Sequence, residues 1–227
     1  MIKHLFNLFY PKPCLICRKT LKEHEEFICL DCFSALPKTN YHKLRSNKVS
    51  ATFLGYSHLK EATAYLHFAK ESSTQQLIHA LKYYGNRSLG VYLGRLAAVE
   101  LKNAGYFTTV DAIIPIPLHE KKERKRGYNQ SVCIAQGIAS IYGCSIDTAT
   151  VCRHIDTQTQ TRKNAYDRHL NVENIFILTS AESLIGKHVL LIDDVMTTGS
   201  TIMACIDVLT AVPDITISIF ALSVAGE

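Results

Sequence analysis

The chain has 227 residues, of which 47% are hydrophobic and 20% are charged, and its formal net charge at pH 7 is +5. This length suits one main domain with a small appendage, and the composition excludes a disordered chain. No apolar run approaches the roughly 18 to 20 residues that cross a bilayer, so we expect no membrane span. The mild positive charge permits an anionic partner without identifying one.

The first feature along the chain is a cysteine module with two CxxC pairs. Its four cysteines are Cys14, Cys17, Cys29 and Cys32. Two such turns can direct four thiolates to one ion, which predicts a closed structural zinc site, with two disulfides or redox-active pairs as alternatives. Four further cysteines are scattered along the chain, and without a signal peptide we expect them to be reduced thiols of a cytoplasmic protein.

A polar connector at residues 36–48 separates this module from the rest, so we predict a zinc-binding domain over 1–48 and a second domain over 49–227. In the second domain, short β-branched runs alternate with segments of helical spacing, which predicts an α/β fold with a mostly parallel sheet flanked by helices. The expected strands are residues 49–55, 63–69, 110–116, 174–178, 188–192 and 215–221. The expected helices are residues 73–83, with Ser72 or Ser73 as the N-cap, then 88–103, 129–142 and 200–210.

A basic run follows the strand expected at residues 110–116. Its cations are Lys121, Lys122, Arg124, Lys125 and Arg126. Such a cluster would attract an anionic small molecule or a nucleic acid, although a solvated charged face is the alternative. Tyr128 could add a stacking surface for a base.

The polar segment at residues 153–171 has neither helical nor strand periodicity, which is typical of a functional loop or lid. Its polar side chains include Arg153, Gln160, Arg162, Arg168 and Asn171. An exposed hairpin without a ligand is the alternative. Lys82 is a further cation, and the sequence leaves open whether it reaches a ligand.

The most informative stretch is HVLLIDDVMTTGST, residues 188–201. An apolar strand followed by a helix predicts a turn at the carboxyl edge of the sheet, where open α/β folds bind ligands. Gly199 permits close backbone approach, and hydroxyl groups and free N–H groups at the start of the helix favour a phosphate. Asp193 and Asp194 would repel that phosphate but could accept hydrogen bonds from a vicinal diol. The pattern therefore predicts a ribose with a phosphate beyond it, whereas a plain strand end and helix cap is the alternative.

This stretch resembles the 5-phosphoribosyl-1-pyrophosphate (PRPP) binding motif of type I phosphoribosyltransferases. The segments VDAIIPIPLHEKKERKRGYNQS (residues 110–131) and RKNAYDRHLNVENIF (162–176), with the four-cysteine module, resemble the ComF family of competence-associated, GntX-like proteins. The similarity extends over essentially the full chain, and RGYNQ at residues 126–130 is its most diagnostic part. A second metal-binding knuckle, which some members carry, is in doubt here because no cysteine lies between Cys32 and Cys133.

The resemblance implies a type I phosphoribosyltransferase-like domain behind an N-terminal zinc-binding domain, with Mg²⁺ bound together with PRPP. It implies a role in DNA uptake during natural transformation. The residues implied to bind PRPP are Asp193, Asp194, Thr197, Thr198, Gly199, Ser200 and Thr201. The residues implied for the pyrophosphate loop and the hood are Pro117, Leu118, Arg126, Arg162 and Arg168.

Two hypotheses about function remain open. In the first, the protein is a PRPP-dependent phosphoribosyltransferase whose acceptor and catalytic residues are unknown. Thr197 stands where related purine transferases often carry an acid, so an acceptor must be activated elsewhere. In the second, a non-catalytic PRPP sensor uses its basic surface and zinc knuckle to bind single-stranded DNA or proteins of DNA uptake.

Overall fold

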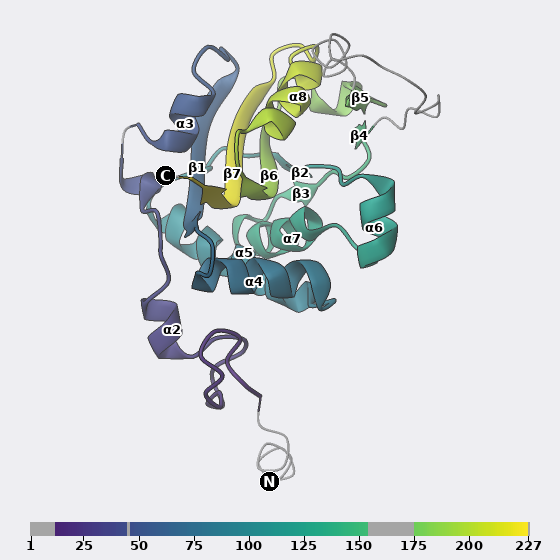
Figure 1. Cartoon of the computed structure of the whole chain (residues 1–227). Coiled ribbons are helices and arrows are strands. Elements are labelled where there is room, and N and C mark those ends of the chain that lie inside the picture. Colours follow the sequence, from purple (N-terminus) through teal and green to yellow (C-terminus); the bar gives the residue numbers. More distant parts are fainter. Residues whose placement is uncertain (1–11, 45, 154–174, 227) are drawn as a thin grey trace.

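The computed structural model describes residues 12–44, 46–153 and 175–226 (Figure 1). The elements of the first half are α2 (Leu30–Ser34), η1 (Tyr41–Lys43), α3 (Lys48–Thr52), β1 (Leu59–Phe68), α4 (Ser73–Tyr83), α5 (Arg87–Asn103) and β2 (Ala112–Pro115). Those of the second half are α6 (Glu120–Arg126), α7 (Gln130–Tyr142), β3 (Ser145–Ile146), β4 (Val151–Arg153), β5 (Phe176–Leu178), η4 (Glu182–Leu184), β6 (His188–Met196), α8 (Ser200–Leu209) and β7 (Thr216–Ala225).

A five-stranded sheet in the order β1-β7-β6-β2-β3 forms the centre of the molecule, and all its strand pairs are parallel. The predicted α/β fold with a parallel sheet is thereby confirmed. β6 lies between β7 and β2, so its carboxyl end opens onto the same edge of the sheet as the turn that follows β2. Strands β4 and β5 form a separate antiparallel pair beside this edge.

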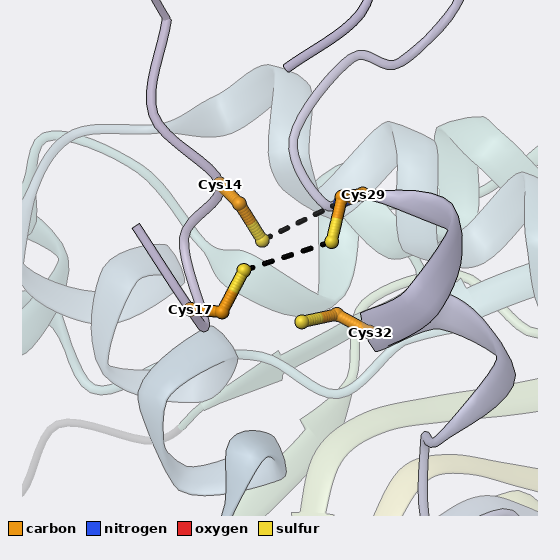
Figure 2. A group of neighbouring side chains, drawn as sticks. All are labelled: Cys14, Cys17, Cys29 and Cys32. Carbon is orange, nitrogen blue, oxygen red and sulfur yellow. Dashed lines mark hydrogen bonds between the residues drawn. The ribbon is translucent and has the colours of Figure 1, made fainter. Parts of the chain in front are cut away.

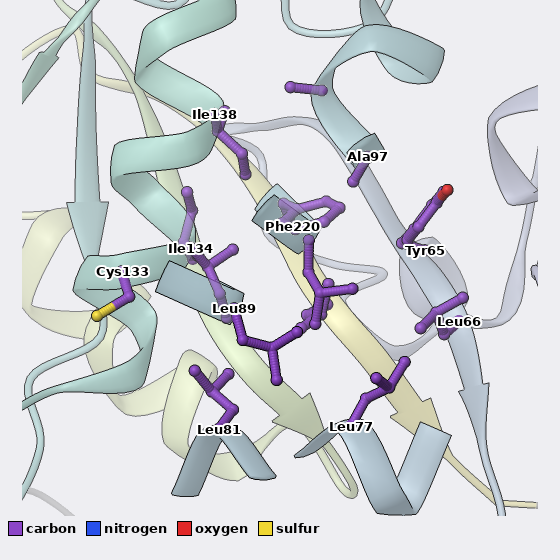
Figure 3. Close-up of a cluster of buried hydrophobic side chains, with 14 of the residues drawn as sticks. Tyr65, Leu66, Leu77, Leu81, Leu89, Ala97, Cys133, Ile134, Ile138 and Phe220 are labelled. Atoms are coloured by element: carbon purple, nitrogen blue, oxygen red, sulfur yellow. The ribbon is translucent and has the colours of Figure 1, made fainter. Parts of the chain in front are cut away.

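Each face of the sheet is covered by helices. Helices α4, α5 and α7 enclose one core with Phe220 and Ile192 of the sheet (Figure 3). Helices α3 and α8 enclose the other. Helices α5 and α7 pack backbone to backbone, because a Cβ atom on Gly94 would collide with the main chain of Ile134. The sheet is therefore buried on both faces, and its carboxyl edge is left for a ligand.

The strand predicted at residues 49–55 is wrong, because residues 48–52 form helix α3. A capping box accounts for the difference. The side chain of Asn47 accepts hydrogen bonds from the backbone N–H groups of Val49 and Ser50, and the Ser50 hydroxyl accepts one from the Asn47 N–H at 3.0 Å. The other five strands and all four helices are confirmed, within a few residues at their ends. The short helix α6, inside the basic run, was not predicted.

The cysteine module packs against the face of the sheet that helices α4, α5 and α7 cover. Its buried residues Cys14 and Ile28 belong to the same core cluster as Leu77 and Leu81 of α4. The connector then pairs with β1 through hydrogen bonds from Thr39 N–H to Tyr65 O and from His67 N–H to Pro37 O. The predicted division into two domains at residue 48 stays a prediction. In the described part of the chain, no helix is both long and apolar enough to cross a membrane.

Candidate functional site

The four cysteines of the module converge on one point (Figure 2). Their sulfur atoms all lie within 4.8 Å of one another, and Cys17 Sγ and Cys29 Sγ are 3.6 Å apart. Zinc bound to sulfur at about 2.3 Å in a tetrahedron places neighbouring sulfurs about 3.8 Å apart, so this geometry fits the ion. The Cys29 N–H also donates to Cys14 Sγ at 3.4 Å. All four cysteines are free of disulfides, and the cluster could hold a metal ion with no position left for water.

The second cluster lies at the carboxyl end of β6. This strand runs to Met196 instead of stopping at residue 192, because Asp193 and Val195 continue the pairing with β7. The two aspartates therefore belong to the end of the strand, and only residues 197–199 form the turn. A rigid strand holds their backbone in place, while the turn leads directly into α8.

The turn itself is tight. Gly199 has a φ of 80° and occupies the N-cap position of α8. A Cβ atom there would lie 3.1 Å from side-chain atoms of Phe53 and Thr52, so α3 also limits this position to glycine. Thr197, Thr198 and Ser200 are exposed to solvent. Within the turn the Thr198 hydroxyl donates to Ser200 Oγ at 3.1 Å and accepts from the Ser200 N–H at 3.4 Å, so an anion at the start of α8 would exchange these contacts for its own.

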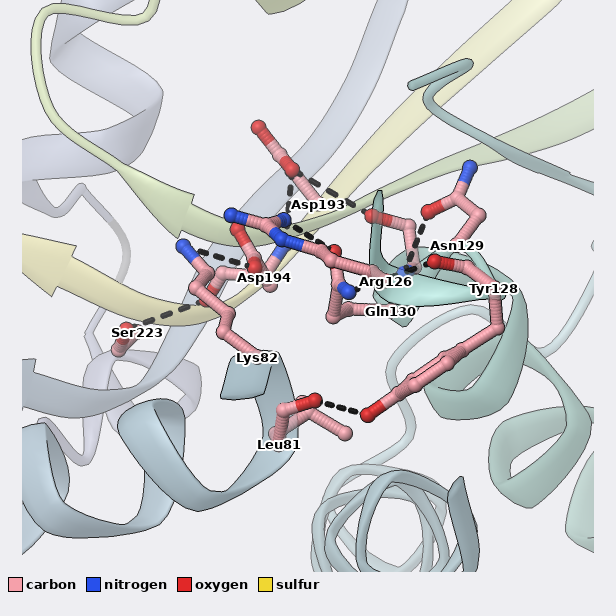
Figure 4. A network of polar contacts seen from close by, with 10 residues as sticks. Leu81, Lys82, Arg126, Tyr128, Asn129, Gln130, Asp193, Asp194 and Ser223 are labelled. Carbon is pink, nitrogen blue, oxygen red and sulfur yellow. Dashed lines mark hydrogen bonds and ion pairs between the residues drawn. The ribbon is translucent and has the colours of Figure 1, made fainter. Parts of the chain in front are cut away.

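Asp194 is buried and forms an ion pair with Lys82 of α4, with 2.9 Å between Lys82 Nζ and Asp194 Oδ2 (Figure 4). Its backbone carbonyl accepts a hydrogen bond from Ser223 Oγ at 3.1 Å. The sequence left the role of Lys82 open, and the structure brings it into this cluster. The ion pair balances a charge that would otherwise be costly at a buried position.

Asp193 lies on the other side of this pair. Its Oδ1 accepts hydrogen bonds from the Asp194 N–H at 2.8 Å and from Ser131 Oγ at 3.4 Å. Burial, and in second place the negative charge of Asp194, raises the pKa of Asp193 to about 7. Burial also lowers the pKa of Arg153, an effect that the charge of Asp193 opposes. Sequence reasoning missed Ser131, for which the only signal was its place directly after RGYNQ.

The RGYNQ segment links the sheet edge to the helices. Tyr128 is buried, its hydroxyl donates to the carbonyl of Leu81, and the Arg87 guanidinium lies 5.1 Å from the centre of its ring. The expectation that Tyr128 offers a stacking surface is therefore wrong. Asn129 caps α7 and donates to the carbonyl of Ile116 at 2.9 Å, so it ties α7 to the turn after β2.

The basic run divides into two parts. On α6 four cations are exposed to solvent: Lys121, Lys122, Arg124 and Lys125. Among them Arg124 pairs with Glu120 at 2.8 Å. Arg126 is half-buried, donates to Gln130 Oε1 at 2.7 Å and lies over the ring of Tyr83 at 5.6 Å. It thus turns toward the cluster around Lys82, as Figure 4 shows.

A cavity of about 220 Å³ adjoins the turn after β2. Pro117 and Leu118 line one side of it, and Val151, Cys152 and Arg153 of β4 line another. The expected pyrophosphate turn and the base of the expected hood thus face each other across one space. The other predicted residues of the hood, Gln160, Arg162, Arg168 and Asn171, lie outside the described residues.

Comparisons with known proteins extend these observations. The family model described as "Phosphoribosyl transferase domain" matches residues 129–213, from the end of the RGYNQ segment to just beyond α8. Two solved structures are similar in outline, an adenine phosphoribosyltransferase (14% identity, TM-score 0.42, 62% of this chain and 72% of that chain) and the adenine phosphoribosyltransferase of Saccharomyces cerevisiae (14%, 0.41, 62% and 71%). These TM-scores are too low to assign the fold. The strand order of the sheet and the match to the domain model assign it instead.

Curated relatives match a longer part of the chain. "DNA utilization protein YhgH" of Salmonella typhi is 35% identical over 129 residues, which are 56% of this chain and 56% of the relative. "Competence protein F" of Haemophilus influenzae is 35% identical over 108 residues, 47% of each chain. The match thus spans about half the length of these relatives. The chain is thus similar over about half its length to a DNA utilization protein and a competence protein, and residues 129–213 match a phosphoribosyl transferase domain.

Proposed function

We propose that the carboxyl edge of the sheet binds PRPP. Asp193 and Asp194 accept hydrogen bonds from the ribose diol, and the turn at residues 197–201 takes the 5-phosphate at the start of α8. The observation that carries this proposal is the meeting of two carboxylates and an anion-binding helix start at one edge of a parallel sheet, inside the matched domain.

The pyrophosphate of PRPP would lie toward the turn after β2. Pro117 and Leu118 line that side of the cavity, and Arg126 supplies a cation held by Gln130. We also assign Arg162 and Arg168, in the sequence between β4 and β5, to the hood that would cover the ligand. A cover with cations suits an anionic ligand and excludes water from a reactive sugar.

Mg²⁺ enters this proposal as a companion of PRPP. It prefers oxygen ligands and is usually bound by one or two carboxylates together with phosphates of the substrate. Asp193 and Asp194 are donors of that class at the end of β6. The ion would neutralise charge on the departing pyrophosphate, while the residues of the chain hold the ribose and both phosphate ends in place.

We further propose that the protein transfers the phosphoribosyl group. The bond between the anomeric carbon and pyrophosphate breaks, a bond to the acceptor forms, and the acceptor releases a proton. Thr197 is a poor base for that proton. The cavity next to Pro117 is open to an acceptor and contains carboxylates, since Glu120 and Glu123 of α6 also line it.

The test of this activity is the release of pyrophosphate from PRPP and Mg²⁺, with and without single-stranded DNA and with a panel of nucleobases and amines. We expect release that stops when Asp193 and Asp194 are replaced by alanine. Tight binding of PRPP without turnover against the whole panel would instead favour the non-catalytic sensor.

The cellular role that we propose is in DNA utilization and natural transformation. The names of the relatives support it, and the free buried thiols Cys133 and Cys205 suit the reducing cytoplasm. In this proposal the cysteine cluster binds one structural Zn²⁺. The partners are PRPP, proteins of the DNA-uptake machinery and single-stranded DNA, for which the exposed cations of α6 supply charge.

A further inference from the structure

An aromatic cluster is exposed on the last turns of α4. It consists of His79, Tyr83 and Tyr84, and we call it the α4 aromatic cluster. The ring centres of His79 and Tyr83 are 4.6 Å apart, and those of His79 and Tyr84 are 5.4 Å apart. Tyr83 and Tyr84 are 58% and 69% exposed. Leu77 and Leu81 of α4 face the core, as Figure 3 shows. The exposed rings of Tyr83 and Tyr84 therefore lie on the solvent side of the helix.

Tyr84 also lines a groove between α4 and the cysteine module. The groove has a volume of about 270 Å³, and Leu15 and Arg18 of the first CxxC turn line its opposite side. One wall is therefore a ring and the other combines an apolar side chain with a cation. This shape suits one planar, apolar ring system attached to a negatively charged group.

Two cations lie near the cluster. Arg126 stands 5.6 Å from the centre of the Tyr83 ring, and Arg18 lines the side of the groove opposite Tyr84. Arg126 also marks the end of α6, whose exposed lysines continue the positive surface. An anionic chain that enters the groove would therefore meet a cation beside the rings.

We propose that this groove binds a base of single-stranded nucleic acid, stacked on Tyr84, while Arg18 contacts a flanking phosphate. The proposal rests on the proposed DNA-handling role and names the surface that performs it. Aromatic side chains in a positively charged groove are the usual means of binding single strands without sequence preference. Bases of a duplex are already stacked and paired, so their faces cannot enter the groove.

The chain contains no tryptophan, which allows a direct test. In the variant Tyr84→Trp a single indole would report stacking, and we expect its fluorescence to be quenched by oligo(dT). The matched control is Ile185→Trp, because Ile185 is 50% exposed and lies outside the groove. Quenching of both variants alike would mean that the base does not reach Tyr84, and would overturn the proposal.

Affinity measured by fluorescence anisotropy at fixed salt supplies the second readout. Because Tyr84→Leu removes the ring on which the base stacks, we expect it to weaken binding of oligo(dT) by about five-fold or more. Tyr84→Phe retains the ring and should bind like the wild type. Thermal unfolding of each variant would show that the fold is intact.

The remaining outcomes separate this proposal from the others. If Tyr84→Leu binds normally but exchange of Lys121 and Lys122 for glutamine weakens binding, α6 is the site and the groove is not. If the wild-type protein binds no single strand, the groove and the DNA partner both fail, while the PRPP site is unaffected. Oligo(U) distinguishes RNA from DNA as the source, and duplex DNA bound as tightly as oligo(dT) would also overturn the proposal.

Discussion

At the scale of single residues, the unusual feature is a pair of adjacent carboxylates with different partners. Asp194 is paired with Lys82 at 2.9 Å, whereas Asp193 has a hydroxyl and a backbone N–H as partners. Burial, and in second place the negative charge of Asp194, raises the pKa of Asp193 to about 7. Asp193 therefore keeps its proton at acidic pH and loses it as the pH rises through about 7.

This arrangement predicts a pH dependence of stability. The pKa of Asp193 is about 7 in the folded protein, and an aspartate in the unfolded chain titrates near pH 4. Between these values the folded state binds more protons, so the free energy of unfolding falls as pH rises and levels off above pH 7. In Asp193→Asn this fall between pH 4 and pH 8 should be smaller by about 3–4 kcal/mol, as measured by urea denaturation.

The control for this measurement is Asp214→Asn, because Asp214 is exposed and lies before β7, away from the carboxyl edge. It should retain the pH dependence of the wild type. Equal pH dependence in the wild type and Asp193→Asn would show that Asp193 does not hold a proton in the folded state.

At the scale of elements, the last turn of α4 connects three parts of the protein. Lys82 pairs with Asp194 of β6, the Leu81 carbonyl accepts from Tyr128, and Tyr84 faces the cysteine module. The helix itself was predictable, because Ser72 accepts from the Gln75 N–H and the apolar spacing continues to Leu81. The contacts of this helix could not be predicted from the sequence, because they join segments that are distant along the chain.

The contrast between local signals and contacts across the chain also explains the other differences between the predictions and the structure. Local signals predicted α5 and α7, whose N-caps Asn86 and Asn129 are visible in the sequence. The capping box at Asn47 is also visible in the sequence, but the β-branched residues after it led to the prediction of a strand there. Ser131 and Asp193 are separated by 62 residues, and only the packing of α7 beside β6 brings them together.

The cysteine module allows a prediction at this scale. One Zn²⁺ per chain should be found by metal analysis, and Cys32→Ser should lose it, because three thiolates no longer close the shell. Since 1 kcal/mol shifts Tm by about 2–4 °C in a chain of this size, we expect Tm to fall by about 4 °C or more.

The matched control is Cys152→Ser, whose sulfur belongs to β4 and not to the cluster. This variant should keep both its zinc and its Tm. Retention of a full equivalent of zinc in Cys32→Ser would exclude Cys32 as a ligand.

At the scale of the whole molecule, the candidate ligand site and the cysteine module lie in different parts of the fold. Its carboxyl edge gathers Asp193, Asp194, the turn before α8 and the cavity beside Pro117. The cysteine module lies beyond α4, on one helical face of the sheet (Figure 1). The central claim is that the carboxyl edge is a PRPP site, on which the proposed phosphoribosyl transfer depends.

Calorimetric titration with PRPP and Mg²⁺ tests this claim most directly, on the wild type, on the double variant Asp193→Asn and Asp194→Asn, and on Asp214→Asn. The account predicts one site per chain in the wild type and in Asp214→Asn. Because each hydrogen bond to a charged group contributes about 1.5–3 kcal/mol, affinity in the double variant should fall at least about 100-fold. Wild-type affinity in the double variant, or no heat of binding in the wild type, would contradict it.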